Sequence, residues 1–238
     1  MARDLLGFSA MSDCFTLILE TSTPHASLAG IEPNGRLQQR EFTSDRSHNA
    51  VLFSPLKELL DAREAQDIGL VLVGSGPGSY SGTRVGIAAA QGVAIAASCP
   101  AVAVPSILAV PSAMNGAPCL AIGDARRGSF WTARIGDSNT ATEPELTDAE
   151  GLGAIVRQAL TDGMAVFTFE APGRFPLAPD SLHQVRLECP SAERLWQAWQ
   201  TAGSETQQYW MAQSPQPIYL KPPHITPAKR PWLVTPQS

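Results

Sequence analysis

The segment VLVGSGPGSYSGTRVGIAAAQGVAIAA, residues 71–97, joins an apolar run to a glycine-rich turn and then to a long run of small residues. The near-continuous apolar run is typical of a strand that is buried on both faces. The small residues that follow recur at helical spacing. A strand, a glycine-rich turn and a helix in this order are the layout that cradles phosphates in many α/β proteins. The segment therefore predicts an α/β fold and raises the question of a nucleotide.

The glycine-rich turn matches neither of the two common nucleotide-binding patterns. Gly74 and Gly76 fit G-x-G-x-x-G, but Ser79 stands where the third glycine belongs. The pattern G-x-x-x-x-G-K-[ST] fails because the turn and helix contain no lysine. Backbone N–H groups and hydroxyls at the helix start leave a phosphate role open. The interpretation we favour is a tight strand-to-helix connection that needs glycine conformations.

The helix after the turn carries a stripe of small residues at every fourth position, so they share one face. Two of them are glycines, and each costs about 1 kcal/mol relative to alanine. That cost is tolerated where another backbone comes close, so we expect a second helix on this stripe. We place it in a partner chain, with packing inside the protein as the alternative. The predicted partner interface comprises Gly82, Arg84, Gly86, Ala89, Ala90, Val93 and Ala94, with Leu52 and Leu56 from the preceding helix.

The two halves of the chain open with the same pattern. Residues 15–19 form an apolar run that ends at Glu20, and a second strand is predicted over 26–31. The pattern returns at residues 119–123, which end at Asp124 and lead to a strand over 129–135. The two acids align, which indicates two halves built from one duplicated unit, although so short a match also arises by chance.

Composition bounds the function. The chain has 238 residues, 44% of them hydrophobic and 16% charged, which is typical of a compact folded protein. Its net charge is −5, so it is a poor candidate for binding nucleic acid unaided. The four cysteines form no C-x-x-C pair, and no two of the four histidines are four residues apart. We therefore expect no metal site. No secretory signal or membrane span is predicted.

The run GPGSYSGTRVG, residues 76–86, is similar to the signature G-P-G-S-[FY]-[TS]-G-x-R-x-G of the TsaB (YeaZ) family. Shorter family motifs are matched at residues 17–22, 46–48, 124–126 and 217–221, so the resemblance runs from Phe15 to Lys221. Two positions depart from the pattern. Glu20 replaces the usual aspartate of the first turn, and Lys221 replaces an arginine.

The resemblance implies two actin-like subdomains of the ASKHA, ribonuclease-H-like class, each an α/β unit with a mixed sheet and flanking helices. We expect an N-terminal extension over 1–14, subdomain I over 15–100, subdomain II over 101–221 and a proline-rich tail over 222–238. The sequence leaves open whether Met1 or Met11 is the start, and what the basic tail does.

The resemblance also implies a cytoplasmic, non-catalytic scaffold or dimerisation subunit for making threonylcarbamoyladenosine in tRNA. Its partner TsaD transfers the threonylcarbamoyl group to adenosine 37, and the ATPase TsaE acts on the pair. The chain would meet tRNA only through that complex and would hold no cofactor alone. ATP or ADP at an interface of the complex, and a homodimer of the free chain, are left open.

The alternative is an enzyme that acts alone, either an actin-like ATPase or a glycoprotease-like hydrolase. The catalytic relative holds a metal through H-x-x-x-H, but here Leu52 stands four residues after His48. We expect Glu20 to accept backbone N–H groups of its turn, and Asp124 and Arg126 to form a turn-stabilising ion pair or, alternatively, an active pair. The predicted degenerate phosphate loop and family motif comprises Glu20, Thr21, Ser22, Gly76, Pro77, Gly78, Ser79, Ser81, Asp124 and Arg126.

Overall fold

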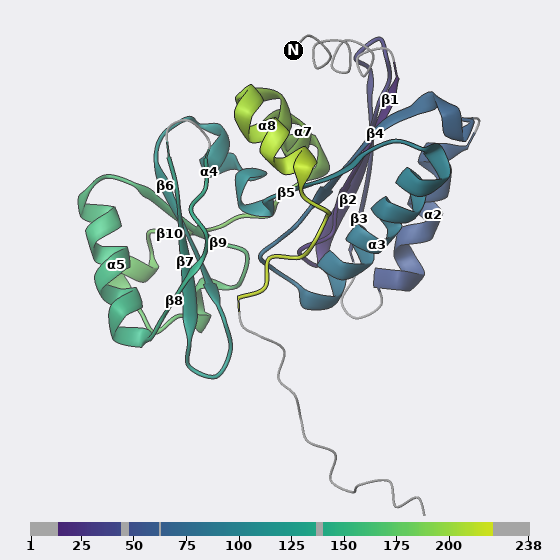
Figure 1. Ribbon diagram of the computed structural model, residues 1–238. Helices are drawn as coiled ribbons and strands as arrows, with labels where there is room; N and C mark the ends of the chain where they lie inside the picture. The colour runs from purple at the N-terminus through teal and green to yellow at the C-terminus, as the bar shows by residue number, and fades with distance from the viewer. Residues whose placement is uncertain (1–13, 44–47, 62, 137–139, 221–238) are drawn as a thin grey trace, which may run out of the picture.

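Two lobes, each built around a five-stranded mixed sheet, make up the protein (Figure 1). The computed structural model describes residues 14–43, 48–61, 63–136 and 140–220. The predicted N-terminal extension, the proline-rich tail and the motif residues Arg46, Ser47 and Lys221 lie outside the described residues, apart from Cys14.

The two sheets have the same topology. The first has the order β3-β2-β1-β4-β5 and the second the order β8-β7-β6-β9-β10. In each, the first three strands along the chain pair antiparallel, and the fourth and fifth run parallel to the first. The strands are β1 (Phe15–Glu20), β2 (His25–Ile31), β3 (Leu37–Thr43), β4 (Ile68–Gly74), β5 (Ala101–Val104), β6 (Cys119–Asp124), β7 (Phe130–Ile135), β8 (Glu145–Thr147), β9 (Ala165–Thr168) and β10 (Val185–Leu187).

This shared topology confirms the predicted duplication. Glu20 is the last residue of β1 and Asp124 is the last residue of β6, so the two acids occupy equivalent places in the two lobes. The architecture implied by the resemblance, two α/β subdomains that each have a mixed sheet and flanking helices, is confirmed as well.

Helices cover the outer faces of both sheets and fill the space between them. They are α2 (His48–Leu60), α3 (Tyr80–Ala97), α4 (Pro111–Met114), α5 (Ala149–Thr161), α6 (Pro179–Leu182), α7 (Ala192–Thr201) and α8 (Ser204–Ala212), with 3-10 turns η1 (Ala65–Asp67), η2 (Ser106–Leu108) and η3 (Pro172–Arg174). Residues 106–114 form η2 and then α4 rather than one continuous helix, because Pro111 starts a new helix at its first position.

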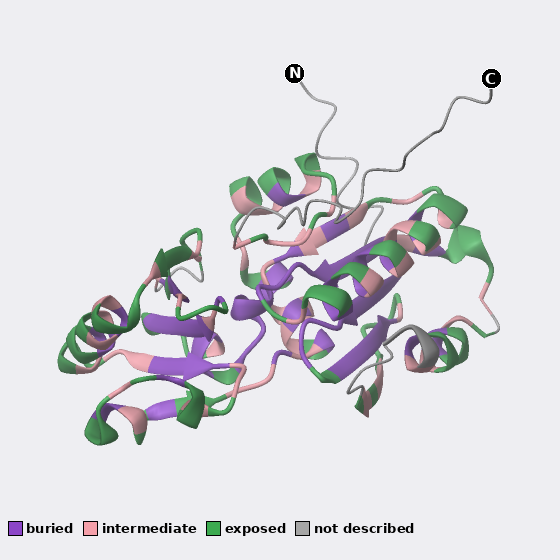
Figure 2. Ribbon diagram, turned by 90° about the horizontal axis from the view of Figure 1, so that it is seen from below, coloured by how far each residue is buried: buried purple, intermediate pink, exposed green. Residues whose placement is uncertain are grey.

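Alternation along the strands divides the core into three clusters. In β1, Leu17 and Leu19 face α2 and α3, whereas Ile18 faces a central cluster between the lobes. The central cluster includes α7 and one face of the second sheet, and α5 covers the other face of that sheet. Figure 2 shows the central strands buried within each lobe and the exposed sides of the helices outside.

The chain crosses between the lobes twice, and these crossings correct the expected division at residue 100. β5 lies after that boundary but pairs with β4 in the first sheet. α7 and α8 lie in the second half of the sequence but pack against strands of the first sheet. They return because their apolar faces complete the central cluster, where Trp199 and Trp210 are both buried.

The small-residue stripe of α3 faces the protein's own core, so its assignment to a partner interface is wrong. Gly82, Gly86, Ala90 and Ala94 are buried within the chain. A Cβ on Gly86 would overlap Thr21 Oγ1, which donates a hydrogen bond to the carbonyl oxygen of Gly82 at 2.8 Å. The prediction that a second helix approaches this stripe is also wrong, because the group that lies against Gly86 is the side chain of Thr21 in the turn after β1.

Leu52 and Leu56 are also buried, 0% and 6% exposed, and so do not form a partner surface in the folded chain. They pack in the cluster beneath α2 and α3. Arg84 is exposed, and Ala89 and Val93 are partly exposed, so their interface role stays a prediction.

Candidate functional site

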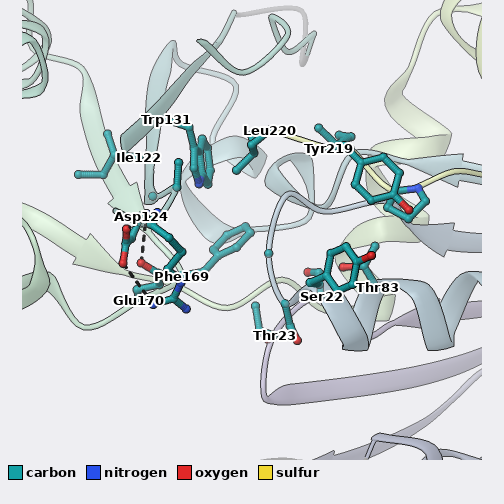
Figure 3. A pocket seen from close by; sticks show the side chains of 18 of the residues that line it. Ser22, Thr23, Thr83, Ile122, Asp124, Trp131, Phe169, Glu170, Tyr219 and Leu220 are labelled. Atoms are coloured by element: carbon teal, nitrogen blue, oxygen red, sulfur yellow. Dashed lines mark hydrogen bonds and ion pairs between the residues drawn. The ribbon is translucent and has the colours of Figure 1, made fainter. Parts of the chain in front are cut away.

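A cavity of about 1180 Å³ lies between the lobes and is lined by residues of both (Figure 3). One wall comes from the turn after β1, the glycine-rich turn and the start of α3. The opposite wall comes from the end of β6, the turn after it, and the segment that follows β9. The final described residues, 217–220, complete the lining. Because the two walls belong to separate sheets, equivalent chain turns face each other across the cavity.

The glycine-rich turn is a tight connection between β4 and α3, as we favoured from the sequence. Gly76 has a φ of 85°, in the region that suits glycine. A Cβ on Gly78 would overlap the carbonyl oxygen of Ser22, which accepts a hydrogen bond from the N–H of Ser79 at 2.6 Å. The Ser79 hydroxyl caps α3 by accepting from the N–H of Gly82 at 3.2 Å. The turn thus packs directly on the turn after β1.

Glu20 lies beneath the cavity and does not line it. Its side chain is completely buried, and Oε1 accepts a hydrogen bond from the N–H of Ser22 at 2.7 Å, which confirms the predicted turn acceptor. Oε2 has no hydrogen-bond partner among the described residues. Burial raises the pKa of the Glu20 carboxyl, against the lowering effect of hydrogen bonds from Ser22. The site therefore favours a neutral carboxyl.

Asp124, the equivalent acid of the second lobe, does line the cavity but is bound to its own turn. Oδ1 accepts from the N–H of Arg126 at 2.6 Å, and Oδ2 lies 3.2 Å from the Arg126 guanidinium. The predicted ion pair is confirmed. Glu170 accepts a hydrogen bond from the N–H of Asp124 at 3.2 Å, and burial raises the pKa of its carboxyl.

The segment before the tail runs along the cavity from the first lobe. The N–H of Ile218 donates to the carbonyl oxygen of Ser75 at 2.9 Å, and Gln91 on α3 binds the carbonyl oxygen of Pro215 at 3.3 Å. The Tyr219 ring lies 6.2 Å from the Tyr80 ring, centroid to centroid. Residues 217–220 of the family motif thus lie at the site, which their sequence did not indicate.

Five of the ten predicted motif residues line the cavity: Ser22, Gly78, Ser79, Asp124 and Arg126. Glu20, at the end of β1, and Thr21, which follows it, are buried, and Gly76, Pro77 and Ser81 do not line the cavity. Sequence reasoning missed most of the other lining residues. Among them are Trp131, Phe169, Glu170 and Arg174 from the second lobe, and Tyr219 and Leu220 from the last described residues.

Two observations concern the described residues only. His, Cys, Asp and Glu side chains do not gather there in groups of three or more that could hold a metal ion. Among the helices of these ranges, none combines the length and the apolar character needed to cross a membrane.

A family model described as "TsaD: tRNA N6-adenosine threonylcarbamoyltransferase" matches residues 22–156, more than half of the chain. The chain belongs to this family. The match begins at the turn after β1 and ends in α5, so it includes the glycine-rich turn and the Asp124 turn that form opposite walls of the cavity.

Within the TsaD family, the chain is similar to TsaB. It is 27% identical over 202 residues to the Escherichia coli (strain K12) tRNA threonylcarbamoyladenosine biosynthesis protein TsaB, covering 80% of this chain and 75% of that protein. The fold matches two Pseudomonas aeruginosa structures. One, described as a protein with similarity to peptidase YEAZ, has a TM-score of 0.67 at 22% identity. The other is YeaZ, with a TM-score of 0.63 at 21% identity. Each match covers 87% of this chain and 100% of the other. The resemblance to the TsaB (YeaZ) family is confirmed.

Proposed function

We propose that this chain is a cytoplasmic, non-catalytic scaffold subunit that supports a TsaD-type catalytic subunit in threonylcarbamoyl transfer to adenosine 37 of tRNA. The observation that carries the non-catalytic role is the state of the two equivalent acids. Glu20 is completely buried in a site that favours its neutral form, and Asp124 is bound by its own turn. Neither carboxylate is presented to a substrate as a general base or a metal ligand.

Leu52 supports the same conclusion. It stands at the position that the resemblance relates to the second histidine of the catalytic relative, and it is completely buried among apolar side chains. The position that would supply a metal-binding histidine is therefore part of a hydrophobic core in this chain. Among the described residues, we find no feature that favours an ATPase or a hydrolase that acts alone.

We propose that the exposed face of α3, opposite the buried stripe, is the surface that binds the partner. Ala88, Gly92 and Ala96 are exposed on it, and Ile95 is 80% exposed. A Cβ on Gly92 would meet no atom within 4 Å. α2 contacts α3 on the outside of the first lobe and exposes Phe53, which is 57% accessible (Figure 1). Small and apolar residues at these positions allow a partner helix to approach closely.

The same face gives the free chain a surface for a homodimer, and the TsaE-type ATPase would act on the assembled pair. ATP or ADP, where it takes part, would bind at an interface of that assembly, and tRNA would be recruited through it. These partners follow from the family and have no direct counterpart in the chain itself.

Titration calorimetry with the TsaD-type subunit of the same organism tests the proposal. Ile95→Lys removes about 1.5–3 kcal/mol of side-chain burial at the interface and adds a buried charge, so it weakens association at least tenfold. The free chain keeps its melting temperature because the side chain is already exposed. Leu187→Lys on β10, where Leu187 is 57% exposed, is the matched control. No association of the unaltered chain refutes the scaffold role, and equal affinities for the two variants refute this face.

A further inference from the structure

The first wall of the cavity presents two accessible tyrosines and an arginine that the scaffold role does not use. Tyr80 is 63% exposed and Tyr219 is 54% exposed. The guanidinium carbon of Arg84 lies 5.0 Å from the Tyr80 ring centroid, and the same guanidinium binds the Tyr80 hydroxyl. These side chains come from α3 and from the end of the described chain. They bring aromatic surface and positive charge to one side of the cavity.

The opposite wall repeats this combination. Arg126 and Arg174 line it and are exposed, the Arg126 side chain by 66% even while it pairs with Asp124. Phe169 is half-buried beside them and offers an aromatic edge. Figure 3 shows Phe169, Glu170 and Asp124 on this side, across the cavity from Tyr219. Both walls therefore pair cations with aromatic rings.

The charge of the cavity is opposite to that of the whole chain. Three arginines line it, from both walls, against two carboxyls, Asp124 and Glu170. Asp124 is paired with Arg126, and burial raises the pKa of the Glu170 carboxyl and so disfavours its charged form. In a protein of net charge −5, a cavity with an excess of arginines attracts an anionic ligand locally.

We propose that this cavity binds a single-stranded RNA segment, with bases stacked on Tyr80 and Tyr219 and phosphates bound by Arg84, Arg126 and Arg174. Sequence-tolerant single-strand sites combine cationic grooves with aromatic platforms, and exposed bases of RNA loops stack on aromatic rings and guanidinium planes. The cavity volume, about 1180 Å³, exceeds the range of roughly 300–1,000 Å³ for small-ligand sites, so it has room for more than one nucleotide.

The strand's identity as substrate tRNA rests on the proposed function, whereas RNA binding itself does not. The RNA affinity of the cavity is modest in the free chain because the net charge of −5 repels the phosphates. In the assembled complex, the cavity would add contacts to a tRNA that the partners already hold.

Fluorescence anisotropy of a labelled single-stranded octaribonucleotide, titrated with the full isolated chain, tests the inference. Three arginine–phosphate contacts predict a salt exponent of about −2, so affinity falls roughly 20-fold between about 50 and 200 mM salt. Two competitors identify the ligand. A duplex RNA and a free adenine nucleotide should each displace the labelled strand much less well than unlabelled single strand.

Paired variants locate the contact. Tyr219→Ala weakens binding at least fivefold, the lower limit for loss of one stacking ring. Tyr209→Ala is its control, because Tyr209 is 62% exposed on α8 and does not line the cavity. Arg174→Ala reduces the salt exponent by about 0.7, and Arg157→Ala, an exposed arginine of α5, does not. Circular dichroism confirms that each variant is folded.

Absence of octaribonucleotide binding at about 50 mM salt overturns the inference. It is also overturned when the controls lose as much affinity as the cavity variants, or when free nucleotide or duplex competes as well as the single strand. If the chain binds the TsaD-type subunit but not RNA, the proposed function stands and this inference is refuted. If it binds RNA but not that subunit, this inference stands and the proposed function is refuted.

Discussion

Replacing Gly86 by alanine should destabilise the protein, although alanine is the better helix former by about 1 kcal/mol. The new methyl group would overlap Thr21 Oγ1, with Thr21 Cβ at 3.4 Å and Cγ2 at 3.5 Å. Thr21 must therefore move and give up its buried hydrogen bond to Gly82. Overpacking costs about 1–3 kcal/mol and the unsatisfied buried groups a further 1–3 kcal/mol, which leaves a net loss of about 3 kcal/mol.

Thermal unfolding of the isolated chain measures this loss. For a chain of this size, about 3 kcal/mol lowers the melting temperature by roughly 6–12 °C. Gly92→Ala, on the exposed side of the same helix, is the control and should raise the melting temperature by about 2–4 °C, because the new methyl group meets no atom within 4 Å. In a Thr21→Ala background, most of the cost of Gly86→Ala should disappear. If Gly86→Ala raises the melting temperature as Gly92→Ala does, the packing of α3 described above is wrong.

Three further outcomes follow from buried or half-buried groups. Burial raises the pKa of Glu20, so ionisation of its carboxyl destabilises the fold as pH rises above about 4.5. Glu20→Gln should therefore be more stable than the unaltered chain at pH 8 but not at pH 4.5, and an equal effect at both pH values would contradict the raised pKa. Glu188 accepts hydrogen bonds from the N–H of Ser112 at 2.9 Å and from the Ser112 hydroxyl at 2.6 Å. Glu188→Ala should therefore lower the free energy of unfolding in urea by about 1–3 kcal/mol, and an unchanged urea midpoint would show that this contact does not stabilise the fold. Cys119 is completely buried and its pKa is raised to about 12, chiefly by burial, so native protein at pH 8 should leave it unalkylated by iodoacetamide while Cys14, Cys99 and Cys189, which are partly exposed, are modified; labelling at equal rates would show that the second lobe opens.

The duplication could be predicted from sequence because each half opens with an apolar run that ends in an acid. Glu20 and Asp124 end equivalent strands, and that alignment was enough to anticipate two related sheets. The return of α7 to the first lobe could not be predicted. Its amphipathic pattern indicates a buried face but not which of two apolar sheets covers it, and the answer depends on contacts distant in sequence.

The orientation of α3 was predicted wrongly for a physical reason. Both of its long faces carry small residues, Gly86 and Ala90 on the buried side and Ala88 and Gly92 on the exposed side. The helix therefore lacks the polar stripe that normally marks the solvent side. The contact of Gly86 with Thr21 determines which face of α3 is buried, and the sequence pattern of the helix alone does not indicate this contact.

Half of the predicted motif residues line the cavity, because the glycine-rich turn and the two acid-ending strands are local features. The opposite wall depends on Phe169 and Arg174, which follow β9, and the first wall is completed by Tyr219 near the end of the described chain. These residues have no shared spacing, so only the fold brings them together.

Reconstitution of tRNA modification tests the central claim most directly. The chain is combined with the TsaD-type subunit, the TsaE-type ATPase, the enzyme that makes the threonylcarbamoyl adenylate, ATP, threonine, bicarbonate and unmodified tRNA. Mass spectrometry of the digested tRNA then measures threonylcarbamoyladenosine. A scaffold role predicts product only when this chain is present, and neither product nor ATP hydrolysis above a mock preparation from the chain alone. Equal product without the chain, or turnover by the chain alone, would contradict the account.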